Sequence, residues 1–330
     1  EGLAAVVLNG KYGFINQTGS WIIPPKYDDA DRFSEGLAAV VLNGKYGFIN
    51  QTGTWVIPPK FDYASWFSEG LVAVALNGKY GFIDQTGTWT IPPKYDEAYS
   101  FDKTVALVML NGKYGFINTS DSLVVPFQYD EVKPHNGSLY KVMLNDKFGF
   151  VNQSGIEVLP CEYDDVDFFR NGLALVTLNG KYGFVNESGA SVIPCKYDDA
   201  GYFNEGLACV RRNGKEGFIN ESGIEVIPCK YDVADSFSEG RALVNINGKW
   251  GFIDKSGTEI IPCKYDWAYS FRDGRAVVQL NGKWGFVDKY GSLVIPCKYD
   301  EAYSFHEGLA EVQLNGKRGY VNKSGVETWD

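Results

Sequence analysis

The chain has 330 residues, of which 45% are hydrophobic and 15% aromatic, so it carries enough apolar material for a sizeable core. Its 31 basic and 41 acidic residues give a formal net charge of −10, and an acidic chain without a basic cluster is a poor nucleic-acid binder, because such binding depends on neutralising phosphates. No apolar run reaches the 18 residues of a membrane-spanning helix, so we expect no membrane span.

One motif, Leu8-Asn9-Gly10-Lys11-Tyr12-Gly13-Phe14, recurs ten times with some drift at a constant spacing of 34 residues. Such strict repetition indicates an array in which each repeat is one structural unit. Its Asn-Gly pair lies between two apolar runs and predicts a hairpin with a type I′ turn, which needs positive φ at both central residues. The second glycine, Gly13, lies inside the return strand, where a glycine indicates a bulge or a close backbone approach.

The repeat spanning residues 27–60 contains four runs in chain order. A Tyr-Asp run at 27–33 comes first, and its apolar spacing also suits a helical turn. A turn at 34–36 leads into the second run, 37–42, and Asn43-Gly44 leads into the third, 46–49. A turn at Thr52-Gly53 leads into the fourth run, 55–57, which we expect Pro58-Pro59 to end.

The second and fourth runs are apolar at consecutive positions, which indicates strands buried on both faces. A lone 34-residue sheet cannot cover both of its faces, so neighbouring sheets must stack. We therefore expect an all-β fold of ten 34-residue repeats, each a propeller-like four-stranded antiparallel meander, in a ring or spiral. An open β-solenoid is the alternative, since ten blades exceed the four to eight of most rings.

Residues 1–330 are expected to form a single array with a possible seam near 127–145. There the usual Phe of the Tyr-Asp run is replaced by His135, Pro134 enters the run, and Asn145-Asp146 replaces Asn-Gly. The stretch also separates repeats that contain Pro-Pro from repeats that contain Pro-Cys. A merely drifted repeat is an equally good explanation.

The pattern Gly-Leu-Ala-x-Val, Asn-Gly-Lys-(Trp/Tyr)-Gly-(Phe/Tyr), Ile-Pro-x-Lys-Tyr-Asp resembles the bacterial WG (KWG) β-repeat family over essentially the whole chain. Only Trp250-Gly251 and Trp284-Gly285 carry the eponymous Trp, while Glu216 and Arg318 are outliers at that position. The resemblance implies a β-rich repeat scaffold and no catalytic residues. It leaves the compartment open, with the cell surface or extracellular space slightly favoured.

Five of the six cysteines occupy the position of the second proline in the early repeats; they are Cys161, Cys195, Cys229, Cys263 and Cys297. The sixth, Cys209, lies in an apolar strand. No Cys-x-x-Cys pair suggests zinc. We expect small buried thiols, with a disulfide between neighbouring repeats as the minority alternative and the redox state left open.

Two charged positions recur through the repeats, an Asp after each Tyr (Asp28, Asp62 and onward) and a Lys after each Asn-Gly (Lys11, Lys45 and onward). The Asp series could be a row of calcium ligands, but calcium needs about six to eight oxygens, so we expect these carboxylates to accept local backbone N–H bonds at the connector. We expect the lysines to keep an edge soluble and to pair weakly with acids. We likewise interpret the Asn-Gln-Thr sequons, such as the one at Asn50, as turns.

No asymmetric catalytic constellation stands out, so we expect neither an enzyme nor a cofactor or metal. The best candidate binding surface is a set of aromatic residues at variable positions of the Tyr-Asp run: Tyr63, Trp66, Tyr99, Tyr202, Trp267, Tyr269 and Tyr303. Such rings could bind a protein partner or stack on sugars, although they could equally pack between blades. We expect a non-catalytic protein-binding scaffold, with a carbohydrate or cell-wall binding module as the alternative.

Overall fold

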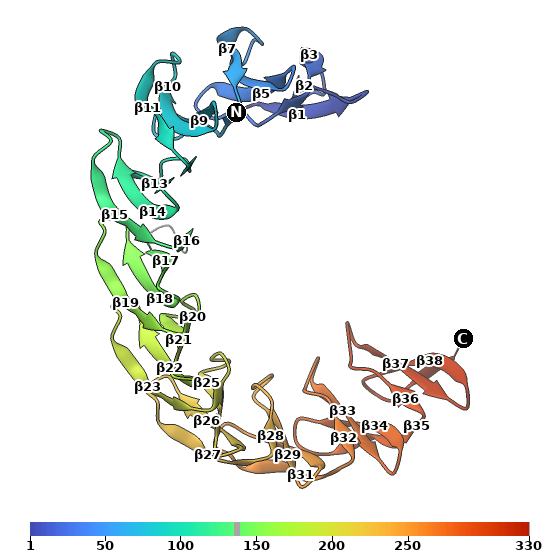
Figure 1. Ribbon diagram of the computed structural model, residues 1–330. Helices are drawn as coiled ribbons and strands as arrows, with labels where there is room; N and C mark the ends of the chain where they lie inside the picture. The colour runs from blue at the N-terminus through green and yellow to red at the C-terminus, as the bar shows by residue number, and fades with distance from the viewer. Residues whose placement is uncertain (135–138, 330) are drawn as a thin grey trace. The chain divides into compact units, whose positions relative to one another are not determined.

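The computed structural model describes residues 1–134 and 139–329. All the secondary-structure elements within these residues are β-strands (Figure 1). The predicted all-β fold is confirmed. The chain divides into two compact units, residues 1–163 and 164–330. His135, one of the residues that suggested a seam, lies outside the described residues, and the seam stays a prediction.

The strands of the first unit follow one another in chain order and repeat in length. They are β1 (Leu3–Leu8), β2 (Lys11–Asn16), β3 (Trp21–Tyr27), β4 (Asp29–Ala30), β5 (Leu37–Leu42), β6 (Lys45–Asn50), β7 (Trp55–Phe61), β8 (Tyr63–Ala64), β9 (Leu71–Leu76), β10 (Lys79–Asp84), β11 (Trp89–Tyr95), β12 (Glu97–Ala98), β13 (Val105–Leu110), β14 (Lys113–Asn118), β15 (Leu123–Tyr129), β16 (Glu131–Pro134), β17 (Leu139–Leu144), β18 (Lys147–Asn152) and β19 (Glu157–Tyr163).

The second unit repeats the same order. Its strands are β20 (Asp165–Val166), β21 (Leu173–Leu178), β22 (Lys181–Asn186), β23 (Ser191–Tyr197), β24 (Asp199–Ala200), β25 (Leu207–Arg212), β26 (Lys215–Asn220), β27 (Glu225–Tyr231), β28 (Val233–Ala234), β29 (Ala242–Ile246), β30 (Lys249–Ile253), β31 (Glu259–Tyr265), β32 (Trp267–Ala268), β33 (Arg275–Leu280), β34 (Lys283–Asp288), β35 (Leu293–Tyr299), β36 (Glu301–Ala302), β37 (Leu309–Leu314), β38 (Lys317–Asn322) and β39 (Glu327–Trp329).

Each repeat builds its own antiparallel meander, as in the order β4-β5-β6-β7. The described residues form ten such sheets, nine with four strands and one, β1-β2-β3, with three. Separate sheets that follow one another are propeller-like blades, whereas a β-solenoid would run its sheets along the stack. We number these blades in chain order, so that β4–β7 is the second blade.

The Asn-Gly turns have the predicted geometry. Asn43 has φ of 53° and Gly44 φ of 73°, and Leu42 pairs with Lys45 directly across the turn. Positive φ at both central residues is the type I′ conformation. The turn between the first two strands has the same character, since Glu35 has φ of 51° and Gly36 φ of 81°.

The outer strand differs from the prediction. The expected end at Pro58-Pro59 is wrong, because β7 continues through both prolines to Phe61. Tyr46 pairs with Phe61 and Phe48 with Ile57, so the prolines lie in a β-bulge, where the ladder needs no N–H donors. The expectation that this strand is buried on both faces is also wrong, since exposed and buried side chains largely alternate along it.

The bulge explains the glycine inside the third strand. A Cβ atom on Gly47 would lie 2.7 Å from the carbonyl oxygen of Ile57 and 2.7 Å from the nitrogen of Pro59. No side chain fits in that space, so the bulged strand passes directly over the glycine. Gly81 in the third blade meets Ile91 and Pro93 in the same way.

The first strand is shorter than the Tyr-Asp run suggested. Tyr27 closes the preceding strand, and only Asp29 and Ala30 pair with β5, opposite Val41 and Val40. A two-residue strand replaces the helical turn that the apolar spacing also allowed. The rest of the run is an extended loop that carries Phe33 toward the preceding blade, where its ring lies 4.8 Å from that of Phe14.

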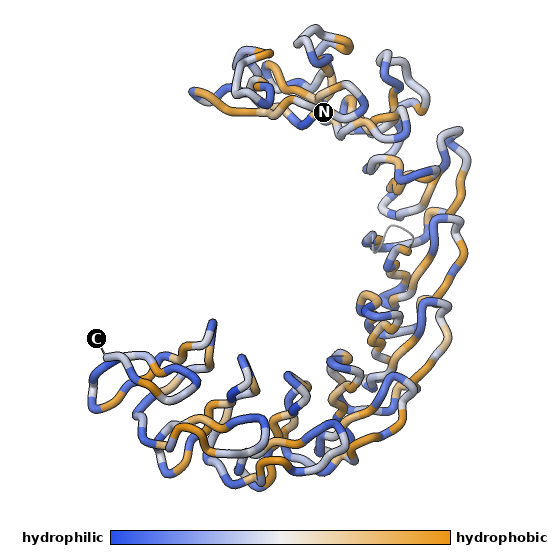
Figure 2. Tube along the Cα trace, turned by 180° about the vertical axis from the view of Figure 1, so that it is seen from behind, coloured by the Kyte–Doolittle hydropathy of each residue, from blue (hydrophilic) through white to orange (hydrophobic). Residues whose placement is uncertain are grey.

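The core lies between successive blades. Five of the six residues of β5 are buried, as the sequence predicted, and apolar stretches recur between hydrophilic turns in every repeat (Figure 2). Leu37, Phe48 and Ile57 of the second blade form one cluster with Phe67 and Val72 of the third. Each such buried side chain contributes about 1.5–3 kcal/mol, so every blade depends on its neighbour.

The drifted fifth repeat keeps this contact by another route. The Phe116 ring lies 4.6 Å from the ring of Tyr140 on β17. Tyr140 occupies the position that Ala38 occupies in the second blade. Phe48 makes the corresponding contact with Phe67, at 5.0 Å. A large ring on the second strand thus supplies the aromatic contact that a phenylalanine of the Tyr-Asp run supplies elsewhere.

The close approach at the bulge gives a first prediction. Gly81→Ala places a Cβ 2.5 Å from the Ile91 carbonyl oxygen, so we expect a loss of about 1–3 kcal/mol or failure to fold. Gly201→Ala is the matched control, because the nearest atom to its Cβ is 3.8 Å away. Urea midpoints followed by circular dichroism measure both, and equal midpoints would contradict the close approach.

Candidate functional site

The recurring Asp and Lys residues belong to one device, which we call the clip. Lys11 Nζ lies 2.5 Å from Asp28 Oδ1, and the backbone N–H of Asn43 donates to Asp28 Oδ2 at 2.7 Å. Lys11 is the first residue of β2 in the first blade, directly after that blade's Asn-Gly turn, whereas Asn43 lies in the Asn-Gly turn of the second blade. Asp28 therefore ties the hairpins of successive blades together.

The clip recurs through both units with the same spacing. The described Lys–Asp pairs within the units are Lys11–Asp28, Lys45–Asp62, Lys79–Asp96, Lys113–Asp130, Lys181–Asp198, Lys215–Asp232, Lys249–Asp266 and Lys283–Asp300. The hydrogen bond from each lysine is the main cause that lowers the pKa of its aspartate. The prediction that these carboxylates accept backbone N–H bonds is confirmed, but the expectation that the donors are local to the connector is wrong, because the donor to Asp28 is Asn43, 15 residues away in the next hairpin.

A second set of inter-blade bonds starts at the positive-φ Glu of the first turn. The Gly70 N–H donates to Glu35 Oε2 at 3.0 Å, and Gln85 Nε2 donates to the same oxygen at 3.2 Å. Both donors belong to the third blade. In the second unit, Asp273 accepts from the Gly308 N–H at 2.7 Å and from Lys323 at 2.6 Å.

The sequon-like triplets form turns. Asn50 Oδ1 accepts the Thr52 N–H at 3.1 Å, the Thr52 hydroxyl at 2.7 Å and the Thr54 N–H at 3.0 Å. Asp84 makes the same three contacts with Thr86 and Thr88 in the next repeat. Asp serves there as well as Asn because only a side-chain oxygen is needed.

All six cysteines are free and half-buried rather than fully buried as expected. The thiol of Cys195 donates weakly to the Val176 carbonyl oxygen at 3.9 Å, on the second strand of the same blade. Desolvation raises the pKa of these thiols, to about 11 for Cys161 and about 12 for Cys209. Five of the thiols are bonded within their own blade and Cys209 to the Ala234 carbonyl of the next blade, so these neutral thiols fill space beside the core.

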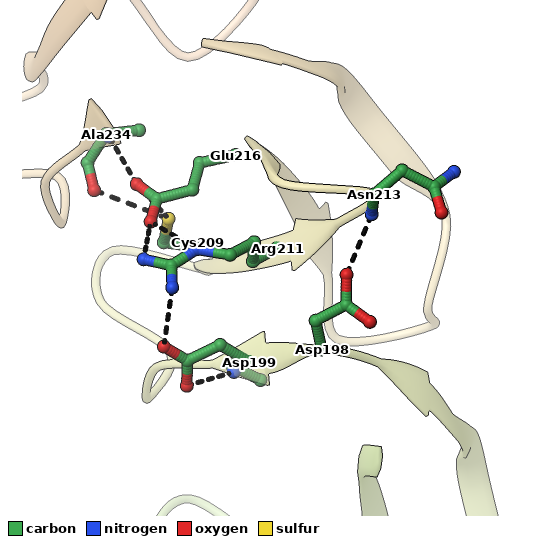
Figure 3. A network of polar contacts seen from close by, with 8 residues as sticks. Asp198, Asp199, Cys209, Arg211, Asn213, Glu216 and Ala234 are labelled. Atoms are coloured by element: carbon green, nitrogen blue, oxygen red, sulfur yellow. Dashed lines mark hydrogen bonds and ion pairs between the residues drawn. The ribbon is translucent and has the colours of Figure 1, made fainter. Parts of the chain in front are cut away.

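The outlier Glu216 shows how the motif tolerates a charge at its aromatic position (Figure 3). Its side chain is buried, accepts the Ala234 N–H at 2.5 Å, and pairs with Arg211 directly across the hairpin. The guanidinium Nε donates to Glu216 at 3.0 Å, and the carboxylate raises the pKa of Arg211. Every polar contact of this network stays within the fold, so we assign it to structure.

The seven candidate aromatics are all exposed, with fractions from 36% for Tyr202 to 56% for Tyr303. Three of them, Tyr63, Trp267 and Tyr269, also contact other rings of the scaffold. Tyr63 lies 5.7 Å from Tyr46 of the second blade and 5.8 Å from Tyr80 of its own. The sequence left open whether these rings face solvent or pack between blades. For the rings with such contacts both hold, since one part of the ring packs against the scaffold while the rest is exposed. That they bind a ligand stays a prediction.

Three of the candidates, Tyr63, Trp66 and Tyr99, line one hollow of about 590 Å³ in the first unit. The hollow lies where β8 of the third blade and β12 of the fourth are neighbours. Its remaining lining residues are Ser65, Tyr80, Glu97, Ala98 and Ser100. The other four candidates, Tyr202, Trp267, Tyr269 and Tyr303, belong to the second unit and do not line this hollow.

Sequence reasoning missed Tyr80 and Glu97 in this hollow. Tyr80 occupies the Trp position of the motif, and its ring lies beside Tyr63, whereas Glu97 occupies the position equivalent to Tyr63 one repeat later. Screening the variable positions for charged side chains, and not for aromatics alone, would have found Glu97. The place of Tyr80 depends on how neighbouring strands pair.

Hydrogen bonds hold the wall of the hollow in place. The Tyr114 hydroxyl donates to Glu97 Oε2 at 2.9 Å, the Tyr99 hydroxyl approaches the same oxygen at 3.4 Å, and Ser65 and Ser100 share a bond of 2.8 Å. Desolvation is the main cause that raises the pKa of Tyr114, and its hydrogen bond with Glu97 is the next. The phenol of Tyr114 therefore remains a donor at neutral pH. Within the described residues, no group of three His, Cys, Asp or Glu side chains gathers as a metal site requires.

Comparison with known families gives one match over almost the whole chain. The family described as WG containing repeat matches nine times, at residues 12–46, 46–80, 80–114, 114–148, 148–182, 182–215, 217–250, 250–284 and 284–317. Most matches begin at the aromatic position of one motif and end at or near the same position of the next. No curated protein matches the chain.

Solved structures resemble the chain only distantly. A crystal structure titled as the eukaryotic initiation factor has 12% identity and a TM-score of 0.40, with 91% of this chain and 96% of that one covered. The extracellular domain of the putative hybrid two component system BT3049 from B. thetaiotaomicron has 9% identity and a TM-score of 0.30; the match covers 100% of this chain and 57% of that domain. Hsv2p of Kluyveromyces lactis has 9% identity and a TM-score of 0.30, with coverages of 80% and 94%.

In residues 1–134 and 139–329, no helix has the length and apolar character that crossing a membrane requires.

The clips give a second prediction. Because their aspartates have lowered pKa values in the folded chain, their stabilising contribution is present above the unfolded pKa near 3.9 and is lost as the pH falls through the folded pKa. We expect the urea midpoint to decline as the pH falls from about 5 to 3. The triple variant Asp62→Asn, Asp96→Asn, Asp266→Asn is the control and should show a lower midpoint at pH 7 and a shallower acid decline. An equally steep decline in the variant would contradict the role of the clips.

Proposed function

The chain belongs to the WG containing repeat family, and on that premise we propose that it is a non-catalytic scaffold that binds a protein partner through its exposed aromatic residues. The observation that carries this proposal is the exposure of all seven candidate side chains on or just after the short first strands of their blades. Trp and Tyr are the residues that dominate binding energy at protein interfaces.

The division of labour within the repeat supports the proposal. The recurring residues are committed to the fold: Asn43 and Gly44 to the turn, Gly47 to the bulge, and Lys11 and Asp28 to the clip. The candidate aromatics lie at positions that change from repeat to repeat, as Tyr63, Glu97 and Trp267 do at one equivalent position. A scaffold with a fixed frame and variable exposed side chains is suited to recognising a partner over several repeats.

The charge of the chain favours a protein partner over nucleic acid. The net charge is −10, and the lysines of the clips are paired with aspartates, so this row of lysines offers phosphates no free positive charge. A partner surface with basic and apolar side chains complements acidic and aromatic ones.

Carbohydrate binding is a second candidate, favoured by one feature of the second unit. Tyr269 and Trp284 stack with their ring centroids 5.7 Å apart and their planes at 18°, and Trp267 lies 5.3 Å from Trp250. Trp267 and Tyr269 are both 46% exposed. Flat, supported and exposed rings are surfaces on which sugar rings can stack.

A paired screen tests the two functions. Peptides selected from a displayed random library should bind the chain saturably, and Trp267→Ala or Trp66→Ala should weaken the peptides that use each ring by at least about tenfold, as expected at an interface hot spot. Tyr290→Ala is the control, because Tyr290 is 73% exposed but lies in a turn away from the first strands. The same proteins are applied to a glycan array. Saturable sugar binding lost in Trp267→Ala, with no selected peptides, would reject the protein-binding proposal in favour of carbohydrate.

A further inference from the structure

The hollow between β8 and β12 combines aromatic rings with a single charge. Tyr63, Trp66, Tyr80 and Tyr99 contribute rings, and Glu97 is the only charged residue among those that line it. Trp66 is 48% and Tyr99 51% exposed, so the rings remain open to a ligand. At about 590 Å³ the hollow accommodates a long side chain together with part of its backbone.

The charges that surround the hollow favour a positively charged ligand. Glu97 has two phenol hydroxyls near one oxygen, Oε2, and a carboxylate can accept about four hydrogen bonds. Lys79 and Lys113, which precede Tyr80 and Tyr114 in the chain, are paired with Asp96 and Asp130. Ring faces carry negative potential as well, so rings and carboxylate together favour a cation.

The geometry favours a guanidinium over an ammonium. A guanidinium is planar, stacks on aromatic faces and presents paired N–H donors to a carboxylate, whereas an ammonium is a compact, strongly hydrated charge. Ser65 and Ser100 bond to each other at the wall and complete a polar rim beside the rings.

We propose that this hollow binds an arginine side chain of the partner protein, with the guanidinium against Glu97 and between the rings of Trp66 and Tyr99. The inference rests on the proposed protein-binding function and adds the chemistry of the partner. The second unit carries a related set, in which Glu301 and Tyr303 correspond to Glu97 and Tyr99 but Ser270 replaces Trp66. That set lacks the ring that Trp66 contributes to the hollow, so Glu301 supplies the control position.

The test uses two isosteric probes, acetyl-Gly-Arg-Gly-amide and the same peptide with neutral citrulline. Titration of the full chain, followed by nuclear magnetic resonance, should give saturable binding of the arginine peptide, at least tenfold tighter than that of the citrulline peptide. Glu97→Gln keeps the acceptor for Tyr114 and should reduce arginine affinity to the citrulline level. Glu301→Gln should leave it unchanged, and Trp66→Ala should weaken it by at least fivefold.

The outcomes separate the inference from the function on which it rests. Equal binding of both probes, or equal effects of Glu97→Gln and Glu301→Gln, would overturn the arginine site. If selected library peptides still bind and depend on the aromatic residues, the protein-binding function survives that result. If no peptide binds and methyl glycosides bind in a manner lost in Trp66→Ala, both proposals are overturned.

Discussion

Blades such as the second and third have a second strand that is apolar on both faces, and no single 34-residue sheet can keep both of those faces from water. The cover comes from the adjoining blade, as in the cluster that joins Leu37 and Ile57 to Phe67 and Val72. Because stacking is obligatory, the polar groups at the rims also come together in a fixed register. The clip at Asp28 and the contact of Glu35 with Gly70 follow from that register and reinforce it. The candidate surface is a by-product of the same stacking, since residues from β8 and β12 line one hollow.

Features encoded within a few residues were predictable from the sequence, whereas those that depend on neighbouring strands were not. The Asn43-Gly44 turn, the close approach at Gly47 and the stacked blades were all predicted, because each follows from local conformational or burial rules. The continuation of β7 through Pro58-Pro59 was missed, since proline usually ends a strand and its bulge is visible only once Tyr46 and Phe61 are seen to pair. The lysines were expected to pair with acids, but the recurring Asp was not identified as their partner, because Lys11 and Asp28 lie 17 residues apart.

The candidate surface shows the same division. Variable aromatic positions identified Tyr63, Trp66 and Tyr99, but the sequence could not show that these three share one hollow while Tyr202 lies elsewhere. Glu97 was overlooked because only aromatic residues were considered as candidates, although Glu97 supplies the charge of the hollow. Glu216 was noted as an outlier, and the structure explains it by its cross-strand pairing with Arg211. In the type I′ register those two residues face each other across Asn213-Gly214, so this pair could have been inferred.

The prolines of the outer strand have a consequence for the behaviour of the chain in a crowded solution. β7 lies at the open edge of its sheet, where unpaired N–H and C=O groups could template the addition of a foreign strand. Pro58 and Pro59 have no N–H to offer, and the bulge they occupy bends the ladder that an incoming strand would have to match. In later repeats Cys replaces the second proline, but the first, such as Pro194, remains. In a molecule built from many small sheets, each outer strand that carries this proline is thereby guarded against amyloid-like growth.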